Sequence, residues 1–183
     1  MAPSALTADE LTALVRRVFK PRESDRALAI VADLPDAVVA DHPAWQERRE
    51  IAAGWAENLE AAARDHGLDV ALYWYRNVRS NNADLPETAW RHLGGSPPGS
   101  ADDLNQASAA PLEEILAAHE MVIAPTEFSA TAPLKMLARQ LGFRAATLPG
   151  FGPAMVPALR LDYTEIDRRV RFLKALLDRA VVA

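Results

Sequence analysis

Residues 27–33 read ALAIVAD, a run of six apolar residues that stops at Asp33. An uninterrupted apolar run of this length is typical of a β-strand covered on both faces, as strands of parallel sheets are. Three further segments predict strands: VALYWY at 70–75, MVIA at 121–124 and RAATL at 144–148.

Segments of helical periodicity lie between these strands. In the longest, Trp45, Trp55 and Leu59 recur at helical spacing, which favours a role in covering the sheet over a role in stacking ligands. Residues 77–110 are rich in Gly, Pro, Ser, Asn and Asp and predict a long irregular connection with at most one short helix. The predicted helices run from Thr7 to about Phe19, from Asp41 to Gly67, from Glu87 to Leu93, from Pro111 to His119, from Pro133 to Leu141 and from Asp162 to about Val181. Thr7 with Glu10, and Asp162 with Glu165, form capping patterns at two of these helix starts, and Gly142 ends the fifth helix. The inner face of the last helix is predicted to carry Ile166, Val170, Leu173, Leu177 and Val181.

Strands that alternate with helices imply right-handed parallel crossovers. The sequence therefore predicts one α/β domain over residues 1–183, with a doubly wound, Rossmann- or flavodoxin-like parallel sheet of about four strands and helices on both faces. The long connection between the second and third strands predicts the order 2-1-3-4. A ligand crevice is expected at the topological switch point of this sheet, lined by residues 33–41 and 126–131.

The composition of the chain disfavours or excludes several classes of function. Half of the 183 residues are apolar and a quarter are charged, as in ordinary globular proteins. The formal net charge of −5 disfavours a nucleic-acid binder, whose affinity rests on clustered Lys and Arg. The absence of cysteine excludes disulfides, thiolate metal sites and thiol catalysis. Without a signal-peptide pattern or an apolar run of membrane-span length, we expect a soluble, cytoplasmic protein with no membrane partner.

Several catalytic motifs are missing from the sequence. Residues 33–37, DLPDA, form neither a dinucleotide-binding nor a Walker loop, and no His-Glu-x-x-His pattern occurs. Asp33, Asp36, Asp41 and His42 cluster near the expected crevice and offer oxygen and nitrogen ligands for a metal. Simpler roles are favoured, with Asp41 as a helix cap, His42 as a first-turn residue and Asp36 as a solvated loop residue.

The most distinctive segment is TEFSATAPLKMLAR at 126–139, which joins the third strand to a helix. The helix N-terminus, with Ser129, Thr131 and Lys135, offers N–H groups and positive charge to a carboxylate or phosphate. The favoured alternative is that the two hydroxyl residues only cap the helix. No Gly-x-Ser-x-Gly elbow surrounds Ser129, which disfavours a serine hydrolase, and Glu127 can act as a base only beside a substrate or metal. The candidate ligand-binding residues are Asp33, Thr126, Glu127, Ser129, Thr131 and Lys135.

This segment, continued by LGFRAATLPGFGPAMVPALRLDYTEID at 141–167, resembles the N-terminal domain of aminopeptidase T-type leucyl aminopeptidases, the dinuclear thermophilic metalloproteases. The opening segment VRRVFKPRESDRALAIVADLP at 15–35 is also similar. The resemblance implies an N-terminal α/β domain followed by a C-terminal domain that supplies Glu, His and Asp metal ligands. It transfers no catalytic residue and no metal ligand to this chain. Iron-dependent dioxygenases that open dihydroxypyridine rings share the architecture, and the sequence does not separate the two groups.

On this resemblance we expect a domain without its metal-binding half, contributing a substrate cleft or dimer contacts. The expected partners are a C-terminal metal-binding domain or partner chain, or a second copy in a homodimer, and a divalent metal is expected only in the C-terminal domain. Residues 181–183, VVA, resemble the entry to a next strand. The alternatives are a stand-alone α/β domain that binds a small anion or other small molecule, and a purely structural oligomerisation partner.

Overall fold

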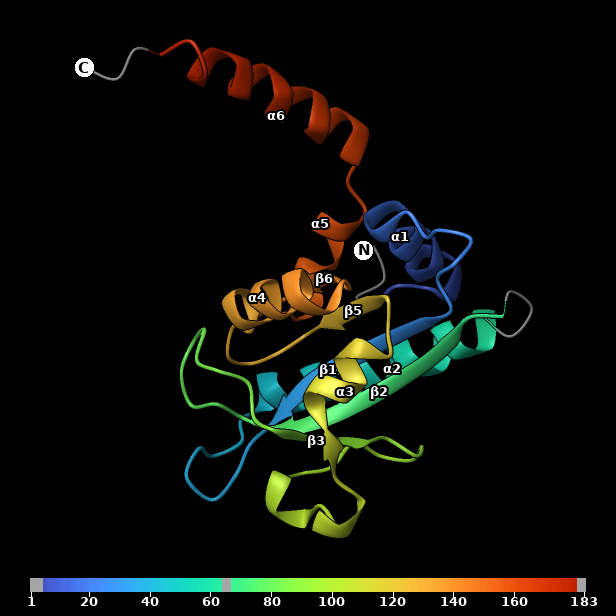
Figure 1. Ribbon diagram of the computed structural model, residues 1–183, viewed down its shortest axis with the longest axis vertical. Coiled ribbons are helices and arrows are strands. Elements are labelled where there is room, and N and C mark those ends of the chain that lie inside the picture. The colour runs from blue at the N-terminus through green and yellow to red at the C-terminus, as the bar shows by residue number, and fades with distance from the viewer. Residues whose placement is uncertain (1–4, 64–66, 181–183) are drawn as a thin grey trace.

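A computed structural model describes residues 5–63 and 67–180, and a six-stranded mixed sheet of order β4-β3-β2-β1-β5-β6 forms its centre (Figure 1). The strands β2, β1, β5 and β6 run parallel to one another. Beyond β2, β3 pairs antiparallel with β2, and β4 pairs antiparallel with β3. The strands are β1 (Ala27–Leu34), β2 (Asp69–Arg76), β3 (Thr88–Arg91), β4 (Ala110–Pro111), β5 (Met121–Ala124) and β6 (Arg144–Thr147).

The α/β class is confirmed, but the prediction of a four-stranded, wholly parallel sheet is wrong. The four predicted strands form only the parallel part, in the order β2-β1-β5-β6. Residues 87–93, predicted as at most a short helix, contain β3, whose Trp90 lies opposite Trp74 of β2 and is buried. Packing against the neighbouring strand sets this conformation, because strand formation depends more on cross-strand contacts than on local propensity.

The two faces of the sheet are covered by different helices (Figure 1). Leu28, Ile30 and Leu34 of β1 belong to a core formed with α1 and α2. Ala29 and Val31 point to the opposite face and belong to a second core formed with α3 and α4. The helices are α1 (Ala8–Phe19), α2 (Pro43–Ala63), α3 (Leu112–Ala117), α4 (Thr131–Leu141), α5 (Val156–Leu159) and α6 (Tyr163–Leu177).

Helix ends follow the predicted signals in part. Thr7 and Glu10 form the predicted capping box at the start of α1, and Gly142 ends α4 in the left-handed conformation at φ 88°. The prediction of Asp41 as the cap of α2 is wrong. The Nδ1 atom of His42 accepts the N–H of Trp45 at 3.3 Å, while Asp41 binds the side chain of Arg49. Residues 64–66, which include His66 and lie just before the predicted helix end at Gly67, are outside the described residues. The strand entry predicted at 181–183 is outside them as well.

The last helix, α6, differs most from its prediction. It begins at the predicted cap, Asp162, whose carboxylate accepts the N–H of Thr164 at 2.9 Å. The face predicted to pack inward is exposed, and α6 leaves the body of the molecule (Figure 1). Periodicity identifies an apolar face but not what covers it, and α1, α2 and α5 already cover the nearby side of the sheet. Among the helices that the structure describes, none has the length and apolar character needed to cross a bilayer.

Candidate functional site

The carboxyl ends of β1 and β5 bring three of the predicted site residues together. Asp33, at the end of β1, is 1% exposed. Its Oδ1 accepts the N–H of Glu127 at 2.7 Å and its Oδ2 accepts the N–H of Phe128 at 3.0 Å. Thr126, which precedes them, is also buried. The topological switch point is therefore closed by a buried carboxylate bound to main-chain donors.

Burial controls the ionisation of Asp33. It raises the pKa of this carboxyl to about 6, although the N–H groups of Glu127 and Phe128 and the charge of Arg48 lower it. The neighbouring Tyr75 pairs with Asp33 in the β1–β2 register, and burial, together with the charge of Asp33, raises the pKa of its phenol well above the ordinary value. Asp33 is thus a buried carboxyl whose pKa lies above the ordinary aspartate value.

Two buried hydroxyls at this edge lack a partner. The Tyr75 hydroxyl and the Thr126 Oγ1 make no hydrogen bond within the part of the chain that the structure describes. Such groups carry a desolvation cost of about 1–3 kcal/mol each. They are therefore available for hydrogen bonds at the one place in the fold where a ligand is expected.

A row of charged side chains runs from the interior to the surface beside Asp33. Arg48 of α2 donates from Nε to the carbonyl of Phe151 at 2.9 Å and forms an ion pair with Glu127. The other carboxylate oxygen of Glu127 lies 3.3 Å from Nε2 of His42. Exposure of the side chains rises along the row, from 5% for Arg48 to 25% for Glu127 and 45% for His42. Because Nδ1 of His42 accepts a main-chain N–H, a neutral ring carries its proton on Nε2, toward Glu127.

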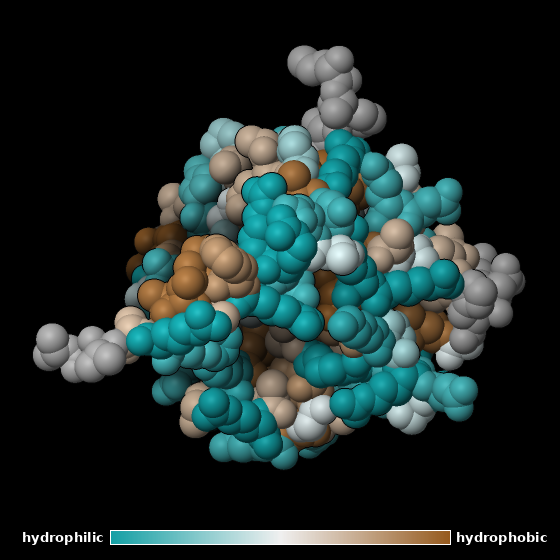
Figure 2. All heavy atoms as spheres, turned by 90° about the horizontal axis from the view of Figure 1, so that it is seen from above, coloured by the Kyte–Doolittle hydropathy of each residue, from teal (hydrophilic) through white to brown (hydrophobic). Residues whose placement is uncertain are grey.

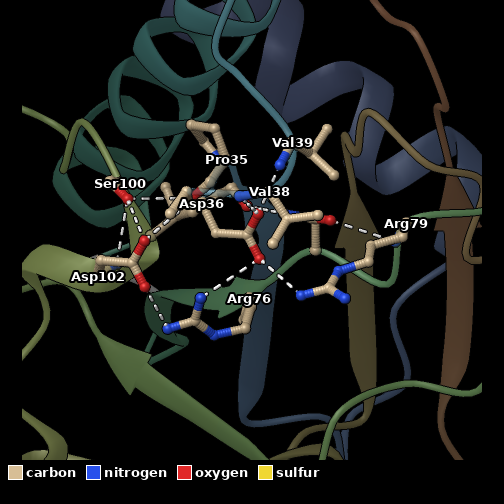
Figure 3. A network of polar contacts seen from close by, with 11 residues as sticks. Pro35, Asp36, Val38, Val39, Arg76, Arg79, Ser100 and Asp102 are labelled. Atoms are coloured by element: carbon tan, nitrogen blue, oxygen red, sulfur yellow. Dashed lines mark hydrogen bonds and ion pairs between the residues drawn. The ribbon is translucent and has the colours of Figure 1, made fainter.

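The loop between β1 and α2 is fixed by Asp36, which is buried and not solvated as predicted (Figure 3). Its carboxylate accepts the N–H groups of Val38 and Val39 in its own loop. It also lies 3.3 Å from Arg76 and 3.5 Å from Arg79, and Arg76 forms a further ion pair with Asp102. Burial raises the pKa of Asp36, but the loop N–H groups and Arg76 outweigh it and bring the pKa to about 2. Asp36 therefore stays ionised as a structural anchor.

The start of α4 forms a separate group. Ser129 Oγ donates to Oδ1 of Asn82 at 3.1 Å, and the N–H of Ala132 donates to the same oxygen at 3.0 Å. The N-cap residue is Ala130 and neither Ser129 nor Thr131. Ser129 Oγ accepts the N–H of Thr131 at 3.4 Å, and the shorter bond to the first turn, from the N–H of Ala132, goes to Asn82 in the β2–β3 connection. An anion at this helix start would have to displace Asn82. Lys135 lies exposed on α4, apart from the row that ends at His42.

The four residues considered as metal ligands are held by different partners. Asp33 accepts main-chain N–H groups, and Asp36 contacts Arg76 and Arg79. Asp41 binds Arg49, and His42 contacts Glu127. Over residues 5–63 and 67–180, no group of three or more His, Cys, Asp or Glu side chains is arranged to hold a metal ion.

Sequence reasoning missed Arg48, Tyr75 and Asn82. A signal existed for Arg48, because it falls on the stripe of α2 whose other members face the core. Comparisons of the chain with models of protein families, with curated proteins and with solved structures gave no match. The geometry of the carboxyl edge is therefore the basis for a functional proposal.

Proposed function

We propose that the chain is the N-terminal α/β domain of a leucyl aminopeptidase-like metalloprotein and that its carboxyl edge forms one wall of the substrate cleft. The metal ligands then belong to a C-terminal domain or a partner chain, as the resemblance implies. The observation that carries the proposal is the row of Arg48, Glu127 and His42, which ends at the surface beside the buried Asp33.

The three segments that resemble the family meet at this row. Asp33 lies in the segment 15–35, Glu127 lies in the segment 126–139, and the Phe151 carbonyl that accepts from Arg48 lies in the segment 141–167. Contacts of this kind hold polar groups in fixed positions, as a binding site requires. The resemblance and the geometry therefore point to the same part of the fold.

Glu127 is suited to bind the α-ammonium group that every aminopeptidase substrate carries. One of its carboxylate oxygens is held by the buried Arg48, and the other contacts only the exposed His42 among the described residues. A substrate ammonium can replace the His42 contact with a stronger, charge-assisted one. Asp33 acts as a positioning residue, because it fixes the main chain of Glu127. A divalent metal bound by the other domain would supply the activated water for hydrolysis.

Hydrolysis of leucine p-nitroanilide in the presence of divalent metals tests the proposal. We expect no activity from the chain alone and metal-dependent activity after the metal-binding domain of a leucyl aminopeptidase of this family is added. Glu127→Gln should lower the activity of the mixture, whereas Glu113→Gln, an exposed carboxylate on α3, should not. Robust metal-dependent hydrolysis by these 183 residues alone would refute the proposal.

The hydroxyls of Tyr75 and Thr126, which have no partner among the described residues, favour a second candidate, a stand-alone domain that binds a small molecule at the same edge. A thermal-shift screen of small carboxylates, phosphates and amines, repeated with Thr126→Val, tests it. A ligand-dependent rise in melting temperature that the variant loses would support this candidate, and its absence across the screen would count against it.

A further inference from the structure

No element in residues 5–63 or 67–180 covers the apolar face of α6. None of the side chains of this 15-residue helix is buried, and exposure along one stripe runs from 38% at Ile166 to 72% at Leu177. Figure 2 looks down on the molecule from the side of α6 and shows a brown area in the region that the helix occupies. Isolated helices of about this length are marginal in water. The stripe therefore calls for a partner.

The spacing of the stripe is that of a coiled-coil seam. Ile166, Val170, Leu173 and Leu177 follow one another at intervals of four, three and four residues, which places them at positions d, a, d and a of successive heptads. In this frame Asp167 and Lys174 occupy the e positions that flank the seam, and Asp162, Arg169 and Leu176 occupy the g positions.

We propose that α6 pairs in antiparallel orientation with α6 of a second copy of this chain. With the two-fold axis between residues 171 and 172, Val170 packs against Leu173 of the second copy and Ile166 packs against Leu177 of the second copy, each contact occurring twice. The same surface serves both copies, so the contact closes on itself and forms a dimer and not a filament.

Charge selects the antiparallel orientation. In the antiparallel pair, each e-position Asp167 faces Lys174 of the second copy, and the stem of Arg169 covers Leu176 of the second copy. In a parallel pair, g residues face the e residues five positions further along, so Asp162 would face Asp167 and Arg169 would face Lys174. Both parallel contacts join like charges, and both are avoided in the antiparallel arrangement.

The beginning of α6 is fixed in a way that directs the helix away from its own body. Arg17 of α1 lies over the ring of Tyr163, 4.3 Å from its centroid, and donates to the carbonyl of Leu159 at 2.9 Å. A groove of about 180 Å³ next to these residues, lined by Val18 and Ala146 among others, is a competing apolar surface within the same chain. Because Arg17 fixes the first turn of α6 at the rim of that groove, we assign the second copy as the partner.

Mass measured by light scattering across a wide concentration range tests the assignment. The full chain should approach twice its monomer mass of 19.9 kDa as its concentration rises, because an interface made by α6 alone is small and weak. Leu173→Asp should raise the dissociation constant at least about tenfold. Arg168→Asp, a change on the outer face of the same helix, should not. A chain that stays monomeric, or whose mass grows without reaching a limit, would overturn the proposal.

Disulfide cross-linking tests the orientation, since the chain has no cysteine of its own. A mixture of Ile166→Cys and Leu177→Cys chains should form a cross-linked heterodimer under mild oxidation, whereas neither variant alone should cross-link. Cross-linking of either variant with itself would indicate a parallel pair and overturn the arrangement. Far-UV circular dichroism of each variant confirms that α6 is retained. Neither result depends on peptidase activity, so this inference stands or falls separately from the proposed function.

Discussion

The buried carboxyl of Asp33 predicts an unusual dependence of stability on pH. Its pKa is about 6 in the folded chain, against about 3.9 for an unfolded aspartate. The folded state therefore binds this proton more tightly than the unfolded state, so the contribution of Asp33 to stability increases as pH falls through about 6 toward about 4. Linkage gives a gain on the order of 1 kcal/mol in the free energy of unfolding between about pH 7 and about pH 5.

Urea unfolding of the wild type and of Asp33→Asn at a series of pH values isolates this contribution. Asparagine does not titrate, and the histidines titrate in both proteins, so their contributions cancel in the difference between the two. The variant also loses one hydrogen bond at every pH, which shifts the difference but not its slope. Asp36 and Glu10, whose pKa values are about 2, act in the opposite direction and only below about pH 4. The free energy of unfolding of the wild type should rise relative to that of the variant as the pH falls from 7 to 5. A wild-type value that stays constant or falls relative to the variant would refute the reasoning.

Substitutions at three further positions have expected effects on the free energy of unfolding, each measurable by urea titration. Arg48→Met leaves Glu127 without its buried partner and should cost about 2–4 kcal/mol, and a loss below about 1 kcal/mol would contradict this account of the ion pair. Asn82→Ala removes the cap of α4 and places alanine at φ 62°, with an expected cost of about 1–2 kcal/mol. Asn82→Gly removes only the cap and should cost less, so equal losses would show that the backbone conformation contributes nothing. Thr7→Ala breaks the capping box and should cost about 1 kcal/mol, and unchanged stability would count against that role.

The parallel part of the sheet could be predicted because its strands are defined locally. β1 and β5 are covered on both faces and read as uninterrupted apolar runs, and the long connection after β2 indicates the order of the strands. β3 and β4 could not be predicted in the same way. They are short and lie in a region rich in Gly and Pro. They form strands because the main-chain groups at the edge of the sheet are there to pair with, those of β2 for β3 and those of β3 for β4.

The candidate site was predictable only where topology decides it. The rule that ligand crevices lie at a switch point predicted Asp33, Thr126 and Glu127 at one edge of the sheet, and the structure places Asp33 in contact with Glu127 there, because Asp33 lies at the end of β1 and the other two follow β5. The cap of α4 could not be found, because Asn82 lies about fifty residues before the helix that it caps and no local pattern links the two. The row from Arg48 to His42 depends on the angle at which α2 crosses the sheet, which periodicity does not specify.

The distribution of arginines explains why Asp33 behaves differently from the other acidic side chains at this edge. Asp36 is paired with Arg76 of β2 and with Arg79 of the connection that follows β2. Asp41 and Glu127 are paired with two arginines of α2, Arg49 and Arg48 respectively. A cation that took these carboxylates as ligands would have to displace the arginines first.

Asp33 binds main-chain N–H groups in place of an arginine, so burial outweighs its stabilisation as an anion and its pKa rises. The edge therefore holds a buried carboxyl of raised pKa, fixed to the main chain of the partly exposed Glu127. Under the proposed function, this carboxyl positions Glu127 for the ammonium group of a substrate.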